Sequence, residues 1–161
     1  MSLGVYELLN TLIFAGIDPE VRKQLHFSFR DHKVQDLQQV HFLVANDGER
    51  AISSIIEPLT LVLPRGVKLL DGSILHKHPK ALDVYINTDE RRNALEFRCP
   101  LLSKGEFFVV KLLLDGKIPR DQLQFRVLAD DLPRTLKLQW LPPRQFGTSG
   151  PVLIGNRLLS A

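Results

Sequence analysis

Cysteine and long apolar runs are scarce in this chain of 161 residues, and each scarcity excludes a class of protein. Cys99 is the only cysteine, which excludes an internal disulfide framework and a multi-cysteine zinc site. No run approaches the roughly 20 consecutive apolar residues that a membrane-spanning helix needs. The composition, 44% hydrophobic and 24% charged, is typical of one globular domain of ordinary size.

The chain also lacks a strong excess of one charge, with 21 Lys and Arg against 18 Asp and Glu. The residues after Asp131 include four basic side chains and no acidic one, whereas the body before them is nearly neutral. Nucleic-acid-binding proteins concentrate Lys and Arg in a patch, because neutralising phosphates supplies much of their affinity. Four dispersed basic residues do not form such a patch, so we expect no nucleic-acid partner.

The N-terminal residues are predicted to form a helix. Apolar residues follow the spacing of one helical face at Val5, Leu8, Leu9, Leu12 and Ile13. Gly16 is a suitable end for this helix, and Asp18-Pro19 is suited to start a second, short helical turn. We expect the stripe, with Leu8 and Leu12 in it, to pack on the domain or on a second copy, which would give a homo-oligomer. A helix lying on a membrane surface is the alternative.

From Leu25 the apolar period changes from 3.6 to 2, which is typical of half-buried strands. Turn sequences such as Asn46-Asp47-Gly48 and Asp115-Gly116 separate the alternating segments. The segments lie at residues 25–30, 40–45, 59–63, 82–87, 95–99, 106–114, 123–127 and 136–140. No helical pattern lies between them, so the sequence predicts an antiparallel sandwich or barrel and not a nucleotide-binding parallel sheet.

Turn and core residues in the middle of the chain follow a characteristic order. They comprise residues 44–48, Ile52, residues 58–61, Leu70, Ile74, Leu75, Pro79, Leu101, Leu102, and residues 104–108 and 112–116. This order resembles an immunoglobulin-like β-sandwich domain found in many uncharacterised bacterial proteins, often after an N-terminal membrane anchor. The resemblance covers about residues 25–130. It implies an immunoglobulin-like fold and a cytoplasmic location at the inner face of a membrane.

Together these features predict an all-β protein in three parts. Residues 1–24 form a helical segment with a short N-terminal α-helix. Residues 25–141 form the immunoglobulin-like antiparallel β-sandwich. Residues 142–161 form a basic C-terminal extension.

His76-Lys77-His78 is the most suggestive local motif. In a strand, residues i and i+2 point to the same face, so both imidazoles can reach one metal ion. A third ligand would have to come from Asp71 or His41, whose positions the sequence does not fix. Exposed histidines at a strand end are the plainer interpretation. A metal-dependent enzyme centred on His76 and His78 is therefore an alternative function.

Three further side chains have a predicted environment. Cys99 is in phase with Phe97, which predicts a buried thiol and not a nucleophile. Phe107 and Val109 are out of phase with the core face of their segment. We expect the N-terminal helix to cover them, or an interaction surface to include them.

These observations favour a non-catalytic binding or interaction module over an enzyme. Its partner would be a protein or a small ligand, bound at sheet edges, at strand-end loops or at the N-terminal helix together with the face that includes Phe107 and Val109. A sensor domain that recognises a small ligand is a narrower form of the same prediction. We expect no cofactor.

Overall fold

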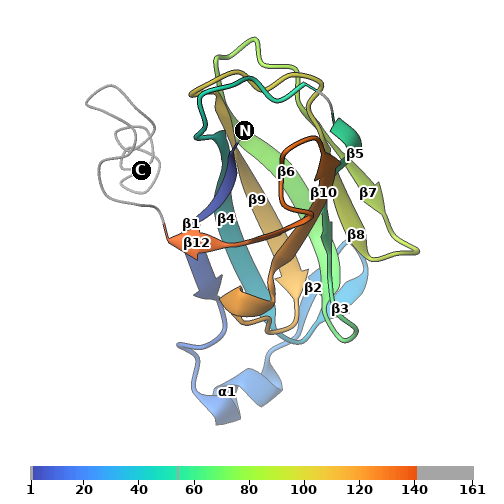
Figure 1. The fold of residues 1–161 in the computed structure, drawn as a ribbon. Helices are drawn as coiled ribbons and strands as arrows, with labels where there is room; N and C mark the ends of the chain where they lie inside the picture. Colours follow the sequence, from blue (N-terminus) through green and yellow to red (C-terminus); the bar gives the residue numbers. More distant parts are fainter. Residues whose placement is uncertain (1, 54, 141–161) are drawn as a thin grey trace.

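Two β-sheets make up most of the chain in the computed structural model, which describes residues 2–53 and 55–140 (Figure 1). The first sheet consists of β1 (Leu3–Leu12), β4 (Leu37–Asn46), β6 (Lys68–His78), β9 (Phe107–Asp115) and β12 (Gln139–Trp140). The second consists of β5 (Ile55–Val62), β7 (Tyr85–Asp89), β8 (Ala94–Arg98), β10 (Gln124–Ala129) and β11 (Thr135–Lys137). The strand orders are β12-β1-β4-β9-β6 and β11-β10-β5-β8-β7.

Apolar side chains from both sheets meet in one core between them. The Phe42 ring of β4 lies edge-on to Phe97 of β8 and Phe125 of β10, at centroid distances of 5.7 and 5.1 Å. Such edge-to-face contacts add to the free energy of burying the rings. The period-2 pattern therefore predicted the core face of these strands correctly, and the mostly β, antiparallel class is confirmed.

The predicted N-terminal helix is wrong, because residues 3–12 form β1. This strand pairs with β4 from Leu3 opposite Asn46 to Leu12 opposite Gln38. Its register shifts at Leu8, and its first four residues are buried on both faces. A strand with two buried faces and a bulge does not alternate, so its apolar spacing imitated that of a helix.

The last described strand closes the sheet at its β1 edge. β12 lies parallel to β1, with Gln139 opposite Tyr6 and Trp140 opposite Glu7. The Arg120 guanidinium lies 3.6 Å from the centroid of the Trp140 ring, and its Nε lies 3.8 Å from the Glu7 carboxylate. Arg120 therefore contacts both strands of this parallel pair.

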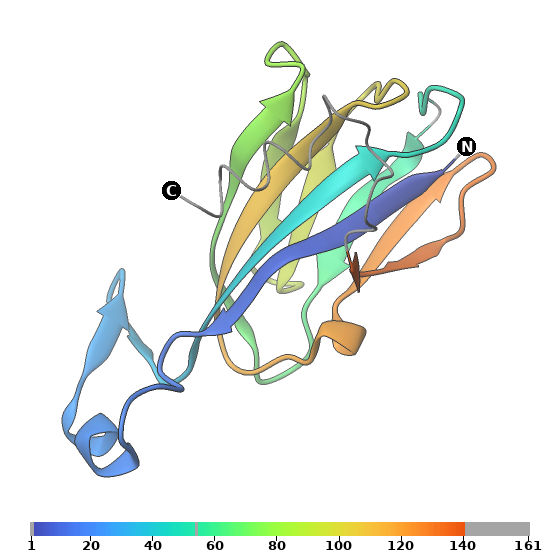
Figure 2. The same ribbon diagram turned by 90° about the vertical axis from the view of Figure 1, so that its left-hand side faces the viewer.

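A small unit projects from one end of the sandwich (Figures 1 and 2). It consists of α1 (Pro19–Gln24), β2 (Phe27–Phe29) and β3 (His32–Val34). The Asp18 carboxylate accepts hydrogen bonds from the backbone N–H groups of Glu20 and Val21, so the predicted short turn and its N-cap are confirmed. In the described part of the chain, no helix is long and apolar enough to cross a membrane. The predicted extension at 142–161 lies outside the described residues.

Candidate functional site

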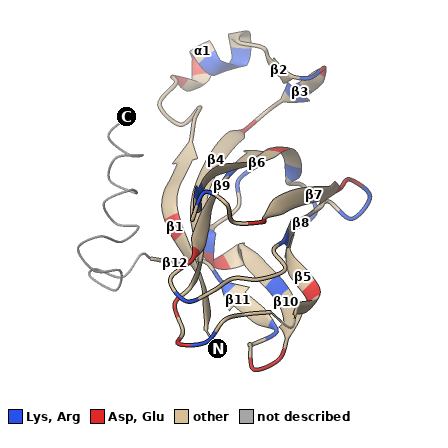
Figure 3. Ribbon diagram, turned by 90° about the horizontal axis from the view of Figure 1, so that it is seen from above, with Lys and Arg blue, Asp and Glu red and all other residues tan. Residues whose placement is uncertain are grey.

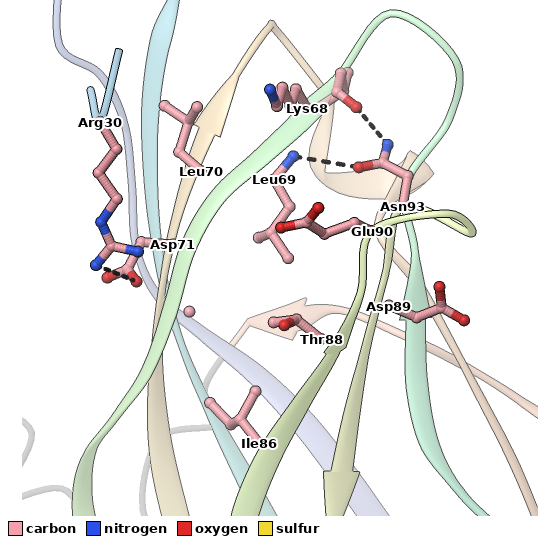
Figure 4. A pocket seen from close by; sticks show the side chains of 12 residues that line it. Arg30, Lys68, Leu69, Leu70, Asp71, Ile86, Thr88, Asp89, Glu90 and Asn93 are labelled. Carbon is pink, nitrogen blue, oxygen red and sulfur yellow. Dashed lines mark hydrogen bonds and ion pairs between the residues drawn. The ribbon is translucent and has the colours of Figure 1, made fainter. Parts of the chain in front are cut away.

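A cleft of about 720 Å³ opens between β6 and β7, which are edge strands of the two sheets (Figure 4). Consecutive residues of β6 from Lys68 to Gly72 line one wall, and Ile86 and Thr88 of β7 line the other. The volume lies in the usual range for ligand sites. The open side of the sandwich is therefore its main candidate site.

Asn93, in the turn between β7 and β8, fixes one end of the cleft. Its side-chain oxygen accepts a hydrogen bond from Leu69 N at 3.3 Å, and its amide nitrogen donates to Val67 O at 2.5 Å. Asn93 has a positive φ of 50°, a conformation that asparagine adopts more readily than most residues. This residue therefore ties the turn to the start of β6.

The projecting unit supplies a charge to the mouth of the cleft. Arg30 lies in the turn between β2 and β3, and its guanidinium is 3.9 Å from the Asp71 carboxylate of β6. Because the Arg30 side chain is 76% exposed, water screens this pair and leaves both groups available to a ligand. Lys68 and Glu90 add further charges of both signs to the lining (Figure 4).

The inner part of the cleft lining, which we call its floor, includes two apolar side chains. Leu69 and Ile86 are partly buried and pack against the main core. An apolar floor with a charged rim can bury hydrocarbon and orient polar groups at the same time. Figure 3 shows the same mixture of signs where β7 is joined to β8. In the sequence, Asp89 at the end of β7 and Glu90 precede Arg91 and Arg92.

The outer face of the first sheet brings together four residues that the sequence singled out. In the register of β6 with β9, His76 is opposite Val109 and His78 is opposite Phe107. The His76 and His78 rings lie 5.8 and 5.1 Å from the Phe107 ring, centroid to centroid. The predicted metal pair and the predicted interaction pair thus share one surface.

Phe107 and Val109 belong to an outer-face cluster, which consists of Tyr6, Leu43, Ala45, Phe107 and Val109. Leu8 packs against this cluster, whereas Leu12 lies at the end of β1 and is 36% exposed. The prediction that an N-terminal helix covers Phe107 and Val109 is wrong, because β1 is a strand of the same sheet. A helical dimer surface through Leu8 and Leu12 is absent for the same reason.

A third metal ligand does not join the two histidines in the described part of the chain. Asp71 is opposite Leu113 and pairs with Arg30, and His41 is opposite Lys111. No group of three or more His, Cys, Asp or Glu side chains that could hold a metal ion occurs among residues 2–53 and 55–140. The metal site at His76 and His78 stays a prediction.

The surroundings of the His76 imidazole are nevertheless unusual for a histidine near the end of a strand. Its Nε2 is buried and has no hydrogen-bond partner among the described residues. Burial lowers the pKa of this imidazole, and the nearby charges of His78 and Lys80 lower it further. The His76 ring lies beside the Phe107 ring, with centroids 5.8 Å apart.

Burial raises the pKa of two other side chains, Cys99 and Tyr6. The Cys99 thiol is buried and donates to Leu101 O at 3.3 Å, and burial raises its pKa to about 11. The predicted buried thiol is confirmed. Burial, together with a hydrogen bond from its hydroxyl to the Asp47 carboxylate, also raises the pKa of Tyr6.

Sequence reasoning missed the cleft. Its charged pair joins Arg30 to Asp71, and no local pattern relates residues so far apart. Asp89 and Glu90 also line the cleft, and no local pattern indicates this, because the approach of β7 to β6 is a tertiary feature.

Relatives give no independent guide to function. No protein-family model matches the chain. Neither a curated protein nor a solved structure is significantly similar to it. Inference about its function therefore rests on the cleft and on the outer face alone.

Proposed function

We propose that this chain is a non-catalytic interaction domain that binds an extended segment of a protein partner in the cleft between β6 and β7. The observation that carries the proposal is the make-up of the cleft. Its floor includes Ile86 and Leu69, and its rim includes Arg30 and Asp71 as a solvent-screened pair. A peptide with an apolar side chain between charged ones matches both parts.

The edge position of β6 also supports a polypeptide ligand. β6 pairs with β9 on one side, and its other side borders the cleft. An extended peptide can lie along such an edge and use its backbone groups. Leu69 N is already taken by Asn93, and register shifts at Leu70 and Leu75 interrupt the edge. We therefore expect side-chain contacts and a few backbone hydrogen bonds, not a complete added strand.

The resemblance to immunoglobulin-like sandwiches agrees with this proposal, by analogy at the level of fold. The same resemblance predicts a cytoplasmic location at the inner face of a membrane. The metal-dependent enzyme stays an alternative prediction. It would use His76 and His78, which lie on one face of β6, as two metal ligands.

Selection from a random peptide library on the full-length chain tests the proposal. We expect enriched peptides to bind the Arg30→Glu and Asp71→Lys variants at least about tenfold more weakly, a loss of about 1.4 kcal/mol or more. Arg126→Glu is the matched control, because Arg126 is exposed on β10 and outside the cleft lining. Failure to enrich any peptide, or equal binding to all three variants, would contradict the proposal.

A further inference from the structure

The hairpin of β2 and β3 reaches the cleft with an unusual backbone at its tip. Arg30 and Asp31 form its two-residue turn, and their φ angles of 46° and 66° are both positive. Turns of this kind prefer Asn, Asp or Gly, and arginine is none of these, because a bulky side chain resists a positive φ. Such strain is found at ligand clamps, where the surrounding structure maintains it. The turn therefore points to a functional reason for placing Arg30 at the cleft.

Two contacts orient the Arg30 guanidinium beside the cleft. The group lies 5.0 Å from the centroid of the Phe29 ring and 3.9 Å from the Asp71 carboxylate. The second separation is longer than a charge-assisted hydrogen bond, which measures about 2.7–2.9 Å. Within the described part of the chain, Arg30 donates no hydrogen bond. Its planar fork is therefore oriented and available to a ligand carboxylate, which arginine binds through two parallel N–H groups.

His32 anchors the hairpin beside this arginine. It is opposite Phe29 in the register of β2 with β3, directly after the turn. Its Nε2 lies 2.8 Å from the Asp115 carboxylate of β9, and its Nδ1 lies 3.4 Å from the Lys68 ammonium of β6. Both neighbours belong to the sandwich, and Lys68 also lines the cleft. His32 therefore fixes the hairpin, and Arg30 with it, relative to the walls of the cleft.

The two sides of the cleft differ in charge. On the β6 side, the cations Arg30 and Lys68 outnumber the anion Asp71. On the other side, Glu90 follows β7 and extends toward the β6 wall (Figure 4). An acidic ligand group would be repelled by Glu90 and attracted by Arg30. The lining therefore gives a bound peptide one favourable side for an acidic side chain.

We infer that the ligand of the cleft is a peptide with an acidic side chain, whose carboxylate binds the Arg30 guanidinium. The inference rests on the proposed function, because it names the side chain of the bound peptide that is recognised. Arg30 is then the specificity-determining residue of the cleft, and His32 is a positioning residue that acts through it.

Peptides recovered from the library selection on the full-length chain test this assignment. We expect them to share an Asp or Glu residue, and its replacement by the matching amide should weaken binding to the wild-type chain at least about tenfold. Arg30→Gln should reduce this discrimination to less than about twofold, because a neutral side chain cannot form the bidentate ion pair. Full discrimination in Arg30→Gln would overturn the inference.

His32→Ala tests the positioning role. We expect it to lower the discrimination at least about threefold while binding of the amide peptide stays unchanged, because only the placement of Arg30 is lost. Lys33→Ala is the matched control, since Lys33 is an exposed residue of the same strand, and it should leave both affinities unchanged. Equal weakening of the acidic and amide peptides by His32→Ala would show a purely structural role and overturn the assignment of His32.

The outcomes separate this inference from the proposed function. Peptides that share no acidic residue, yet bind the Asp71→Lys variant more weakly than the Arg126→Glu control, would overturn the inference and leave the cleft proposal in place. Failure to enrich any peptide would overturn both.

Discussion

At the scale of single residues, the Asp115 carboxylate joins the projecting unit to the sandwich. It accepts hydrogen bonds from the His32 imidazole at 2.8 Å and from the backbone N–H groups of Gln35 and Asp36 at 3.1 and 3.0 Å. Burial alone would raise the pKa of this carboxyl. The three hydrogen bonds outweigh burial and hold its pKa below the ordinary value.

This depressed pKa makes the stability contribution of Asp115 depend on pH. The contribution is complete above the unfolded-state pKa of 3.8 and is lost as the pH falls through the lower folded-state pKa. We expect Asp115→Asn to lower the free energy of unfolding by about 1–2 kcal/mol at neutral pH. Urea unfolding at a series of pH values should show this difference shrinking as the wild-type carboxyl becomes protonated. A difference that stays constant into strong acid would contradict this account.

Asn46 offers a second test at this scale, because its side chain is fully buried. Its Nδ2 donates to Arg50 O at 2.7 Å and to Leu102 O at 2.9 Å, and its Oδ1 accepts from Gly48 N at 3.0 Å. Asn46→Asp would place a carboxylate against two carbonyl oxygens, so we expect a loss of about 3 kcal/mol. The exposed Asn87→Ser is the control and should change stability by less than about 0.5 kcal/mol, because it removes only a long, exposed hydrogen bond to Glu96. Similar urea midpoints for both variants would refute the assigned network.

At the scale of elements, the strands that sequence patterns found are those in which buried and less buried positions alternate over part of the length. β9 and β10 alternate along most of their length, and both were predicted. β1 and β6 were not: β1 is buried on both faces at its start, and β6 has register shifts at Leu70 and Leu75. An extra residue at each bulge breaks the period of two, so the sequence holds no regular pattern to detect there.

Substitutions within β1 distinguish the strand from the helix that its spacing imitates. Val5 is 1% exposed and faces the core, whereas Leu12 is 36% exposed. We expect Val5→Ala to cost about 2 kcal/mol and Leu12→Ala less than about 1 kcal/mol. Free energies from urea unfolding measure both. Equal losses, which a shared helical face would produce, would argue against the strand.

The projecting unit depends on one arginine. The Phe14 and Phe27 rings stack with centroids 4.2 Å apart, and the Arg22 guanidinium lies 4.4 and 5.1 Å from them. Arg22 also donates to the backbone carbonyl of Gln35. Lysine lacks the planar fork that makes these contacts together.

Arg22→Lys should therefore loosen this unit and leave the sandwich intact. We expect amide hydrogen exchange in β2 and β3 to become about tenfold faster, while exchange in β9 stays unchanged. Exchange measured by mass spectrometry on peptic fragments resolves the two regions. Faster exchange throughout the chain, or none in β2 and β3, would disprove the local role of Arg22.

At the scale of the whole molecule, the candidate sites arise from strand register and from the approach of separate segments. His76 and Phe107 were each singled out from sequence, but their contact follows from the pairing of β6 with β9. The cleft needs Arg30, Asp71 and Ile86 from three separate elements. Individual residues such as His76 and Phe107 could thus be singled out from the sequence. The way in which they assemble into one surface could not be predicted from it.

The parallel pairing of β12 with β1 has a consequence for biosynthesis. The ribosome releases β1 first and β12 last among the described strands. Until Trp140 emerges, the growing chain has an open β1 edge, and Glu7 and Arg120 lack the strand that closes over them. Open edges invite pairing with other nascent chains. The pairing that covers Tyr6 and Glu7 of this edge therefore forms only after Trp140 has emerged, and nascent chains that stop before that point keep the whole β1 edge open.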